Sequence, residues 1–386
     1  MTHAALTRLQ DGLAALQADH LERRRPLLDG AQGARITIDG QRVVSFCSND
    51  YLGLAADPAL VQAAHAALDE CGVGAGAAHL ITGHHRFHED FEAAFARFVG
   101  KPAALLFSTG YMANLGVLTA LLGRRGEVFG DKLNHASLVD AAQLSGATLT
   151  RYRHNDLAQL EGQLAASKAQ DKLIVSDLVF SMDGDTAPVD ALLDLAERHD
   201  AWLYLDDAHG FGVLNDGRGG LSERARTSDR VIYLATLGKA AGVAGAAVAA
   251  HAGVIAWLIQ KARPYIYTTA SPPLLAACLL ESLRQIEAGG ARRERLRGHV
   301  AQLREGLAGL KRGVLLPSDT PIQPLVIGSN DAAVRLSQAL LQRGLLVAAI
   351  RTPTVPVNTA RLRITLSAAH SADDVALLVE ALHAVA

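Results

Sequence analysis

Two segments of the chain carry side chains that could do chemistry together. An apolar run ending at Leu205 is followed directly by Asp206 and Asp207, with His209 close behind, and Lys239 follows a second apolar run. Carboxylates and an imidazole at the end of a buried strand are typical of a functional site. They fit a capped turn and a satisfied histidine equally well.

The carboxylate and the lysine together indicate pyridoxal-phosphate (PLP) chemistry. A lysine holds the cofactor aldehyde as a Schiff base, and a carboxylate keeps the pyridine nitrogen protonated, so that the ring can accept electrons from a substrate carbanion. A nucleotide-binding P-loop is rejected for Gly238-Lys239, because the first glycine of that motif is missing and Ala240 stands where serine or threonine would bind magnesium.

A phosphate-binding turn is also needed, and one candidate lies between a predicted strand and a predicted helix. Ser108-Thr109-Gly110-Tyr111 precedes a helical pattern at 112–122. Free N–H groups at the start of that helix would face a phosphate. An ordinary capped turn remains a competing interpretation, since serine, threonine and glycine are common there.

Two other motifs suggest different chemistry. The glycine-rich segment 72–76 resembles a dinucleotide fingerprint, but it follows a helical pattern and His79 replaces its last glycine. We therefore interpret it as a flexible loop on the substrate side, and a nicotinamide or flavin dehydrogenase is the runner-up from a different reaction class. His84, His85 and His88 have neither a cysteine nor HExxH spacing beside them, so we expect them to be structural and predict no metal site.

The elements that must position these groups form an α/β pattern. Short apolar runs alternate with helical patterns and predict a mostly parallel sheet covered by helices on both faces, with functional groups at the carboxyl ends of the strands. The predicted strands span residues 103–108, 127–130, 148–152, 173–179, 202–205 and 231–235.

After Pro272-Pro273 the pattern changes to a long helix and a smaller α+β domain. Its predicted strands span 322–327, 345–350 and 362–366, and its last helix begins at Ser371 with Asp374 in a capping box. We therefore expect three parts: a helical arm with a short β segment at 1–45, a large cofactor-binding domain at 46–280 and a small domain at 281–386.

Composition limits the class of protein. With 37 basic and 39 acidic residues among 386, the net charge is −2, so we expect no nucleic-acid partner. Cys47, Cys71 and Cys278 form no paired motif, which favours a reducing cytoplasm. The longest apolar stretch, 243–259, is too weak to cross a membrane. An amphipathic helix is predicted near the N-terminus, packing on the body or on a second subunit, from its leucines Leu6, Leu9, Leu13 and Leu16.

Nearly end to end, the sequence resembles the α-oxoamine synthases, which are fold-type I PLP enzymes. Ordered motifs carry the resemblance: Ser48-Asn49-Asp50-Tyr51-Leu52-Gly53, Asn134-His135-Ala136-Ser137, Phe180-Ser181-Met182-Asp183-Gly184-Asp185, Asp206-Asp207-Ala208-His209-Gly210, Thr236-Leu237-Gly238-Lys239 and Arg361-Leu362-Arg363.

The resemblance implies a role for each matching residue. Lys239 would form the Schiff base, Asp206 would pair with the pyridine nitrogen, His209 would bond the ring oxygen and His135 would stack on the ring. The remaining cofactor contacts would come from Gly110, Tyr111, Ser181 and Thr236, with Thr268 or Thr269 reaching the phosphate from the second subunit of a homodimer.

Within the family, the segments 349–356 and 151–156 are most similar to the member that condenses L-alanine with a pimeloyl thioester, on coenzyme A or acyl carrier protein, in biotin synthesis. Arg363 and Asn49 would then bind the amino-acid carboxylate, and Arg23 and Thr354 would lie along the acyl path. A sibling that uses glycine with an acetyl or succinyl thioester, and a cofactor-binding protein without turnover, remain alternatives.

Some positions depart from the family pattern. Phe211 replaces a small residue, and alanines replace small polar or glycine residues at Ala75, Ala77, Ala78 and Ala270. None of these changes removes a catalytic group, but together they bear on the shape of the acyl channel.

Overall fold

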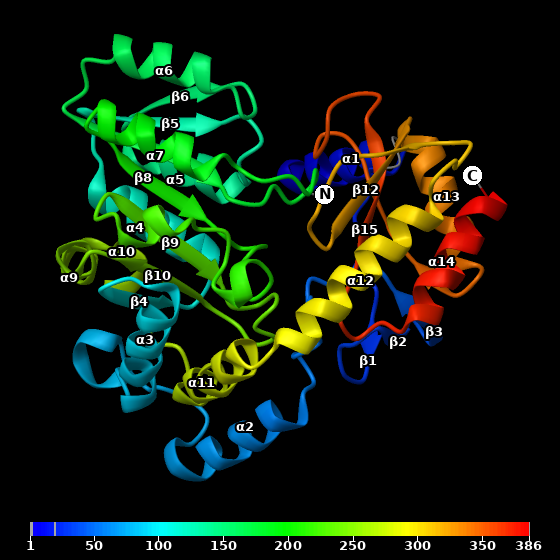
Figure 1. The fold of residues 1–386 in the computed structure, drawn as a ribbon, viewed down its shortest axis with the longest axis horizontal. Coiled ribbons are helices and arrows are strands. Elements are labelled where there is room, and N and C mark those ends of the chain that lie inside the picture. The colour runs from blue at the N-terminus through cyan, green and yellow to red at the C-terminus, as the bar shows by residue number, and fades with distance from the viewer. Residues whose placement is uncertain (1–2, 19–20, 386) are drawn as a thin grey trace.

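The computed structural model describes residues 3–18 and 21–385. Figure 1 shows two bodies, a large one built on a central sheet and a smaller one that contains the C-terminal helix. Two helices in succession, α11 (Pro273–Glu287) and α12 (Gly290–Gly306), lead from the large body into the smaller one.

The large body contains a seven-stranded sheet in the order β4-β10-β9-β8-β7-β5-β6. Only β10 runs antiparallel to its neighbours, so the predicted mostly parallel sheet is confirmed. The sequence analysis missed β10. The strands are β4 (Ala103–Phe107), β5 (Gly126–Asp131), β6 (Thr148–Tyr152), β7 (Asp171–Asp177), β8 (Trp202–Asp206), β9 (Val231–Thr236) and β10 (Ala246–Ala250).

Helices cover both faces of this sheet, which explains why its strands are apolar on both sides. Leu203, Leu205 and Tyr233 belong to one buried cluster, whereas the alternate residues Tyr204 and Ile232 belong to another. The first cluster packs on α3 (Arg86–Val99), α6 (Leu157–Ala166), α7 (Val189–Arg198) and α11, and the second on α4 (Gly110–Leu121), α5 (Ala136–Ser145), α9 (Ala252–Lys261) and α10 (Arg263–Ile266).

The smaller body contains strands from both the N-terminal and the C-terminal parts of the chain. Its main sheet has the order β11-β12-β15-β14, and a second sheet, β1-β2-β3-β13, pairs N-terminal strands with a C-terminal one. The single strand predicted at 345–350 is wrong, because the chain changes sheet at the buried Val347. The bounds are β1 (Leu28–Asp29), β2 (Arg35–Ile38), β3 (Gln41–Ser45), β11 (Val314–Leu315), β12 (Ile322–Gly328), β13 (Leu345–Leu346), β14 (Ala348–Ile350) and β15 (Ala360–Thr365).

The remaining helices are α1 (Ala4–Ala18), α2 (Pro58–Cys71), α8 (Glu223–Thr227), α13 (Asn330–Leu341) and α14 (Ala372–Val385). Ser371 and Asp374 exchange side-chain-to-backbone hydrogen bonds at the start of α14, as the predicted capping box requires. All four leucines of α1 are exposed, so this helix does not pack on the body of its own chain. No helix in the described ranges is both long and apolar enough to span a membrane.

The predicted division at residues 45 and 280 stays a prediction. The strands β1 to β3, which lie before residue 46, pair with β13 near the C-terminus, and α11 continues through residue 280.

A tight corner after β8 depends on Asp207. Its carboxylate accepts hydrogen bonds from the hydroxyl of Tyr233 at 2.7 Å and from the backbone N–H of Gly220 at 2.8 Å. Gly219 packs against the same group: a Cβ there would lie 2.1 Å from both the Asp207 carboxylate and the Tyr233 hydroxyl. The backbone can approach these buried groups only because residue 219 has no side chain.

We therefore expect Gly219→Ala to destabilise the fold much more than Gly30→Ala. Both glycines have a positive φ, +89° and +91°, so both substitutions incur the same backbone cost, roughly 1–2 kcal/mol. Only Gly219 adds a clash, which contributes about 1–3 kcal/mol more. Thermal unfolding midpoints of the two variants measure the difference, and equal midpoints would contradict the packing described here.

Candidate active site

A cavity of about 210 Å³ lies at the carboxyl edge of the large sheet. It is lined by Gly110, Tyr111, Asn114, His135, Ser137, Asp177, Ser181, Asp206, Ala208, His209, Thr236 and Lys239. Eight of the residues predicted from sequence thus meet in one place. A larger hollow of about 730 Å³ in the small body, near β2, β3 and α14, contains none of the predicted site residues.

Two buried carboxylates, Asp177 and Asp206, end the neighbouring parallel strands β7 and β8 and lie opposite each other in the sheet. Asp206 accepts hydrogen bonds from the side chain of Asn114 at 2.9 Å and from the backbone N–H of Ala208 at 3.1 Å. Burial and the charge of Asp206 raise the pKa of Asp177 well above its usual value. The carboxyl of Asp177 is therefore more readily protonated than an exposed carboxyl.

Lys239 lies close to these carboxylates. Burial lowers the pKa of its amine to about 8, although the charges of Asp206 and Asp177 oppose that shift. Its Nζ is 3.0 Å from Nε2 of His209. Burial and the charge of Lys239 lower the pKa of His209 well below its usual value, so this imidazole is neutral.

A hydrogen-bond chain fixes the orientation of His209. Its Nδ1 lies 2.5 Å from the hydroxyl of Tyr51, which in turn donates to the side-chain oxygen of Asn49 at 3.3 Å. With the hydroxyl proton directed to Asn49, Nδ1 of His209 carries the proton and Nε2 presents a lone pair to Lys239. The lysine amine is thus held by an acceptor that carries no charge.

His135 caps the start of α5 and lines the cavity. Its backbone N–H donates to Asp177 at 2.6 Å, and its Nδ1 is 2.7 Å from the hydroxyl of Ser137. That hydroxyl also accepts a hydrogen bond from Asn114 at 2.8 Å, so one network fixes the imidazole and the Asp206 carboxylate together. An imidazole fixed at Nδ1 in this way can form one wall for a flat ligand.

Arg363, on β15 of the small body, connects the two bodies at the site. Its guanidinium donates to the backbone oxygen of Ser181 at 2.6 Å and to the side-chain oxygen of Asn49 at 3.2 and 3.3 Å. The side chain is buried, with 7% of the residue exposed. A planar guanidinium in this position suits a carboxylate ligand.

His154 also holds the segment that contains Ser181. This imidazole bridges the carboxylates of Asp131, at 3.2 Å, and Asp185, at 2.6 Å, and it packs edge-on against Phe180. Burial opposes its positive charge, but the two carboxylates prevail and raise the pKa of His154 to about 10. A charged bridge therefore joins the end of β5 to the segment containing Ser181.

The cavity also offers a place for a phosphate. Thr109 caps α4 by accepting the backbone N–H of Met112 at 3.1 Å, which leaves the first N–H groups of the helix available to an anion. A Cβ on Gly110 would lie 2.8 Å from the hydroxyl of Thr236, so this space is open only because residue 110 is glycine. A carboxylate, an amine and a phosphate cradle in one cavity fit PLP.

Several predicted residues do not line the cavity. Arg23, Thr354 and Thr269 are exposed and Thr268 is half-buried. Asn49 and Arg363 are not lining residues either: Asn49 is connected to His209 through Tyr51 and accepts a hydrogen bond from Arg363. Phe211, which departs from the family pattern, packs in the core against Phe95 and Phe98, with ring centroids 5.3 and 6.2 Å apart. It does not line the cavity.

The sequence analysis missed Asn114, Ser137, Asp177 and Ala208 as lining residues. Asn114 had a local signal, because it is a polar residue inside an otherwise apolar helical pattern. Asp177 lies within a predicted strand, and its importance follows only from its pairing with Asp206 in the sheet.

Known proteins are similar to this chain in sequence and in fold. The family described as aminotransferase class I and II matches residues 41–382. An 8-amino-7-oxononanoate synthase of Thiobacillus denitrificans (strain ATCC 25259 / T1) is 79% identical, over 100% of both chains. The chain belongs to the aminotransferase class I and II family, as an 8-amino-7-oxononanoate synthase homologue.

Solved structures agree with this family. The 8-amino-7-oxononanoate synthase of Francisella tularensis is 31% identical with a TM-score of 0.77, covering 89% of this chain and 97% of its own. A serine palmitoyltransferase from S. paucimobilis, with a bound PLP–myriocin aldimine, is 28% identical with a TM-score of 0.91, covering 98% of this chain and 96% of its own. The predicted fold class, PLP fold type I with a smaller C-terminal domain, is confirmed, as is the prediction of an enzyme of this family.

The shifted amine of Lys239 leads to a test on cofactor-free protein. Because burial lowers its pKa to about 8, we expect its reaction with an amine-directed reagent to reach half of its maximum near pH 8. Peptide mass spectrometry across a pH series measures this midpoint, with the exposed Lys168 as the internal reference. A Lys239 midpoint equal to that of Lys168 would contradict the electrostatics described here.

Proposed function

We propose that this protein binds PLP and condenses L-alanine with a pimeloyl thioester, carried on coenzyme A or acyl carrier protein. The products would be 8-amino-7-oxononanoate, carbon dioxide and free thiol, in biotin biosynthesis. The observation that carries the proposal is the placement of Lys239 beside His209 and Asp206 in the cavity, in a chain so similar to an 8-amino-7-oxononanoate synthase.

PLP, when bound, supplies an aldehyde for a covalent bond to an amine and a ring that accepts electrons from the substrate carbon. Asp206 would hold the proton on the ring nitrogen, and Asn114 would keep that carboxylate in place. His135 would form one wall for the ring. Thr236 and the start of α4 would hold the phosphate.

Lys239 would act both as the covalent anchor and as the base. An amine with a pKa of about 8 is partly unprotonated near neutral pH. It can therefore act as the base that removes a proton from the alanine Cα. The neutral His209 accepts a hydrogen bond from this amine and so directs it within the cavity.

Arg363 would bind the carboxylate of alanine. After the acyl group is added, this carboxylate would leave as carbon dioxide, and the carbon that loses it would take up a proton. The buried guanidinium already contacts Asn49, whose oxygen also accepts from Tyr51 in the chain that reaches His209. Substrate binding at Arg363 and proton transfer at Lys239 would therefore share one hydrogen-bond network.

The proposed assembly is a homodimer with shared sites. The resemblance implies that Thr268 or Thr269 would reach the phosphate bound by the second subunit, and neither lines the cavity of its own chain. The exposed leucines of α1 offer a further apolar surface that a second copy could cover.

The proposal is tested by thiol release from purified, PLP-loaded protein. L-Alanine is compared with glycine, and pimeloyl with acetyl and succinyl thioesters, each pair in otherwise identical assays. We expect the alanine and pimeloyl pair to be preferred. The alanine methyl group contributes only about 1–3 kcal/mol, so the preference over glycine should be roughly 10- to 200-fold. Preference for glycine would assign the protein to a sibling reaction, and no thiol release with PLP bound would reject condensation.

A second prediction isolates the lysine. Lys239→Ala should still retain PLP in the cavity, because the phosphate and ring contacts remain, but without a covalent bond. Turnover should fall by at least about 10²-fold, the lower range for loss of a positioned acid–base group. Borohydride trapping measures the covalent bond and thiol release measures turnover. Lys168→Ala, at an exposed position, is the matched control, and wild-type turnover in Lys239→Ala would reject the assignment.

A further inference from the structure

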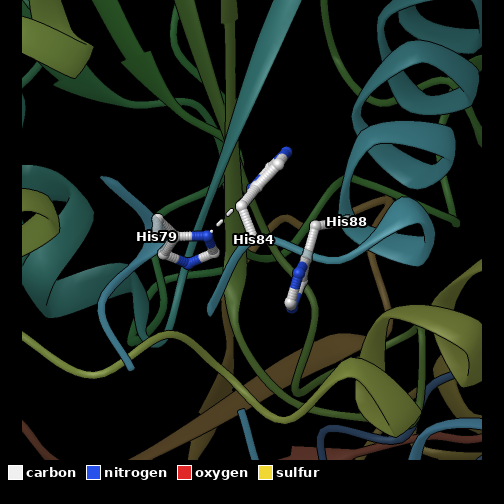
Figure 2. Close-up of side chains that lie close together, drawn as sticks. All are labelled: His79, His84 and His88. Atoms are coloured by element: carbon white, nitrogen blue, oxygen red, sulfur yellow. Dashed lines mark hydrogen bonds between the residues drawn. The ribbon is translucent and has the colours of Figure 1, made fainter. Parts of the chain in front are cut away.

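Three histidines come together outside the active-site cavity. His79 lies at the start of a π-helical turn, η1 (His79–Gly83), His84 follows that turn, and His88 lies in the first turn of α3. Figure 2 shows their imidazoles grouped side by side, and each pair of ring centroids is 5.0 to 5.5 Å apart. One nitrogen from each ring lies within 4.8 Å of the others.

This cluster differs from the one considered in the sequence. The sequence analysis expected His84, His85 and His88 to be structural. His85 has such a role, because it caps α3 by accepting the backbone N–H of Phe87 at 3.2 Å, and it is not part of the cluster. His84 and His88 instead meet His79, which the sequence analysis treated only as part of a glycine-rich loop. No local spacing signals this arrangement, because the π-helical turn brings the rings together.

We propose that His79, His84 and His88 form a binding site for a divalent transition-metal ion of the zinc type. Three imidazole nitrogens with one open position are a known zinc ligand set, and imidazole also suits nickel, copper and cobalt.

The separation of the first two ligands fits such an ion. Nδ1 of His79 and Nδ1 of His84 are 3.0 Å apart, joined by the dashed line in Figure 2. Two ligands of a tetrahedral zinc with bonds of 2.0–2.1 Å are about 3.3 Å apart. The ion would replace the single proton now shared by these nitrogens, with little movement of either ring.

Protonation and the surrounding groups also favour the metal. Burial, with the neighbouring imidazoles, lowers the pKa of His79 and His88 to about 4, so both are neutral near pH 7. Nε2 of His84 is 3.2 Å from the carboxylate of Glu89, which would orient that ring and contribute negative charge. His79 is stacked on Tyr265, with centroids 4.7 Å apart.

His88 would have to exchange one hydrogen bond for the ion. Its Nδ1 accepts the backbone N–H of His85 at 2.9 Å, and its Nε2 donates to the backbone oxygen of Ser271 at 2.9 Å. His84 remains partly open, with 28% of its side chain exposed, which gives the ion an entry path. Binding would thus compete with the contact between α3 and the segment that contains Ser271.

The test is a titration of the PLP-loaded protein with Zn²⁺, after treatment with a chelator and desalting. Calorimetry should give one ion per chain. Co²⁺ is the spectroscopic probe, since four-coordinate cobalt bound by imidazoles has visible bands that hydrated cobalt lacks. His84→Ala should weaken Zn²⁺ binding by at least tenfold and Glu89→Gln by roughly tenfold. His65→Ala, at an exposed histidine of α2, is the matched control and should bind as the wild type does.

The proposal is overturned if wild-type protein shows no saturable Zn²⁺ binding, if His84→Ala binds as tightly as wild type, or if His65→Ala loses as much affinity. The cobalt spectrum of wild-type protein needs no variant, so it decides the matter even if His84→Ala fails to fold. These readouts report metal binding alone. They therefore stand or fall separately from the condensation reaction.

Discussion

Two carboxylates buried side by side, Asp177 and Asp206, impose the main constraint on this structure. Adjacent parallel strands end at the same edge of the sheet, so the groups that follow them are brought together away from water. Burial and the charge of Asp206 together raise the pKa of Asp177, because two negative charges held side by side away from water are costly. The lysine at the end of the next strand carries the compensating charge.

The same constraint explains the depressed pKa of Lys239. Burial disfavours its charged form, and only the nearby carboxylates hold the pKa as high as about 8. In an apolar pocket without these carboxylates the pKa of a lysine would fall further, and a lysine at the surface would remain charged. Burial lowers the pKa of Lys239, and the charges of Asp206 and Asp177 raise it. The two effects together give an amine that can both carry and release a proton near neutral pH.

The sequence predicts those parts of the site that depend on local pattern. Lys239 and Asp206 follow apolar runs, and the strand-end rule then places them at one edge. Residues separated by most of the chain are different: the contact between Arg363 and Asn49 follows from the packing of β15 against the N-terminal region, and only the family resemblance pointed to it. The change of sheet at Val347 left no signal either, because its neighbours form one continuous apolar run.

Neighbouring residues of one type can have separate roles for a simple geometric reason. Asp206 and Asp207 are adjacent in the sequence, but successive side chains at a strand end point to opposite sides. Asp206 therefore faces Asn114 and the cavity, whereas Asp207 faces Tyr233 and the corner at Gly220. Burial raises the pKa of Asp207 to about 7, although the hydrogen bonds from Tyr233 and Gly220 oppose that shift, and the carboxyl serves a tight backbone corner. Composition alone counts two equivalent acids, and the pleat of the strand makes one a functional group and the other a structural one.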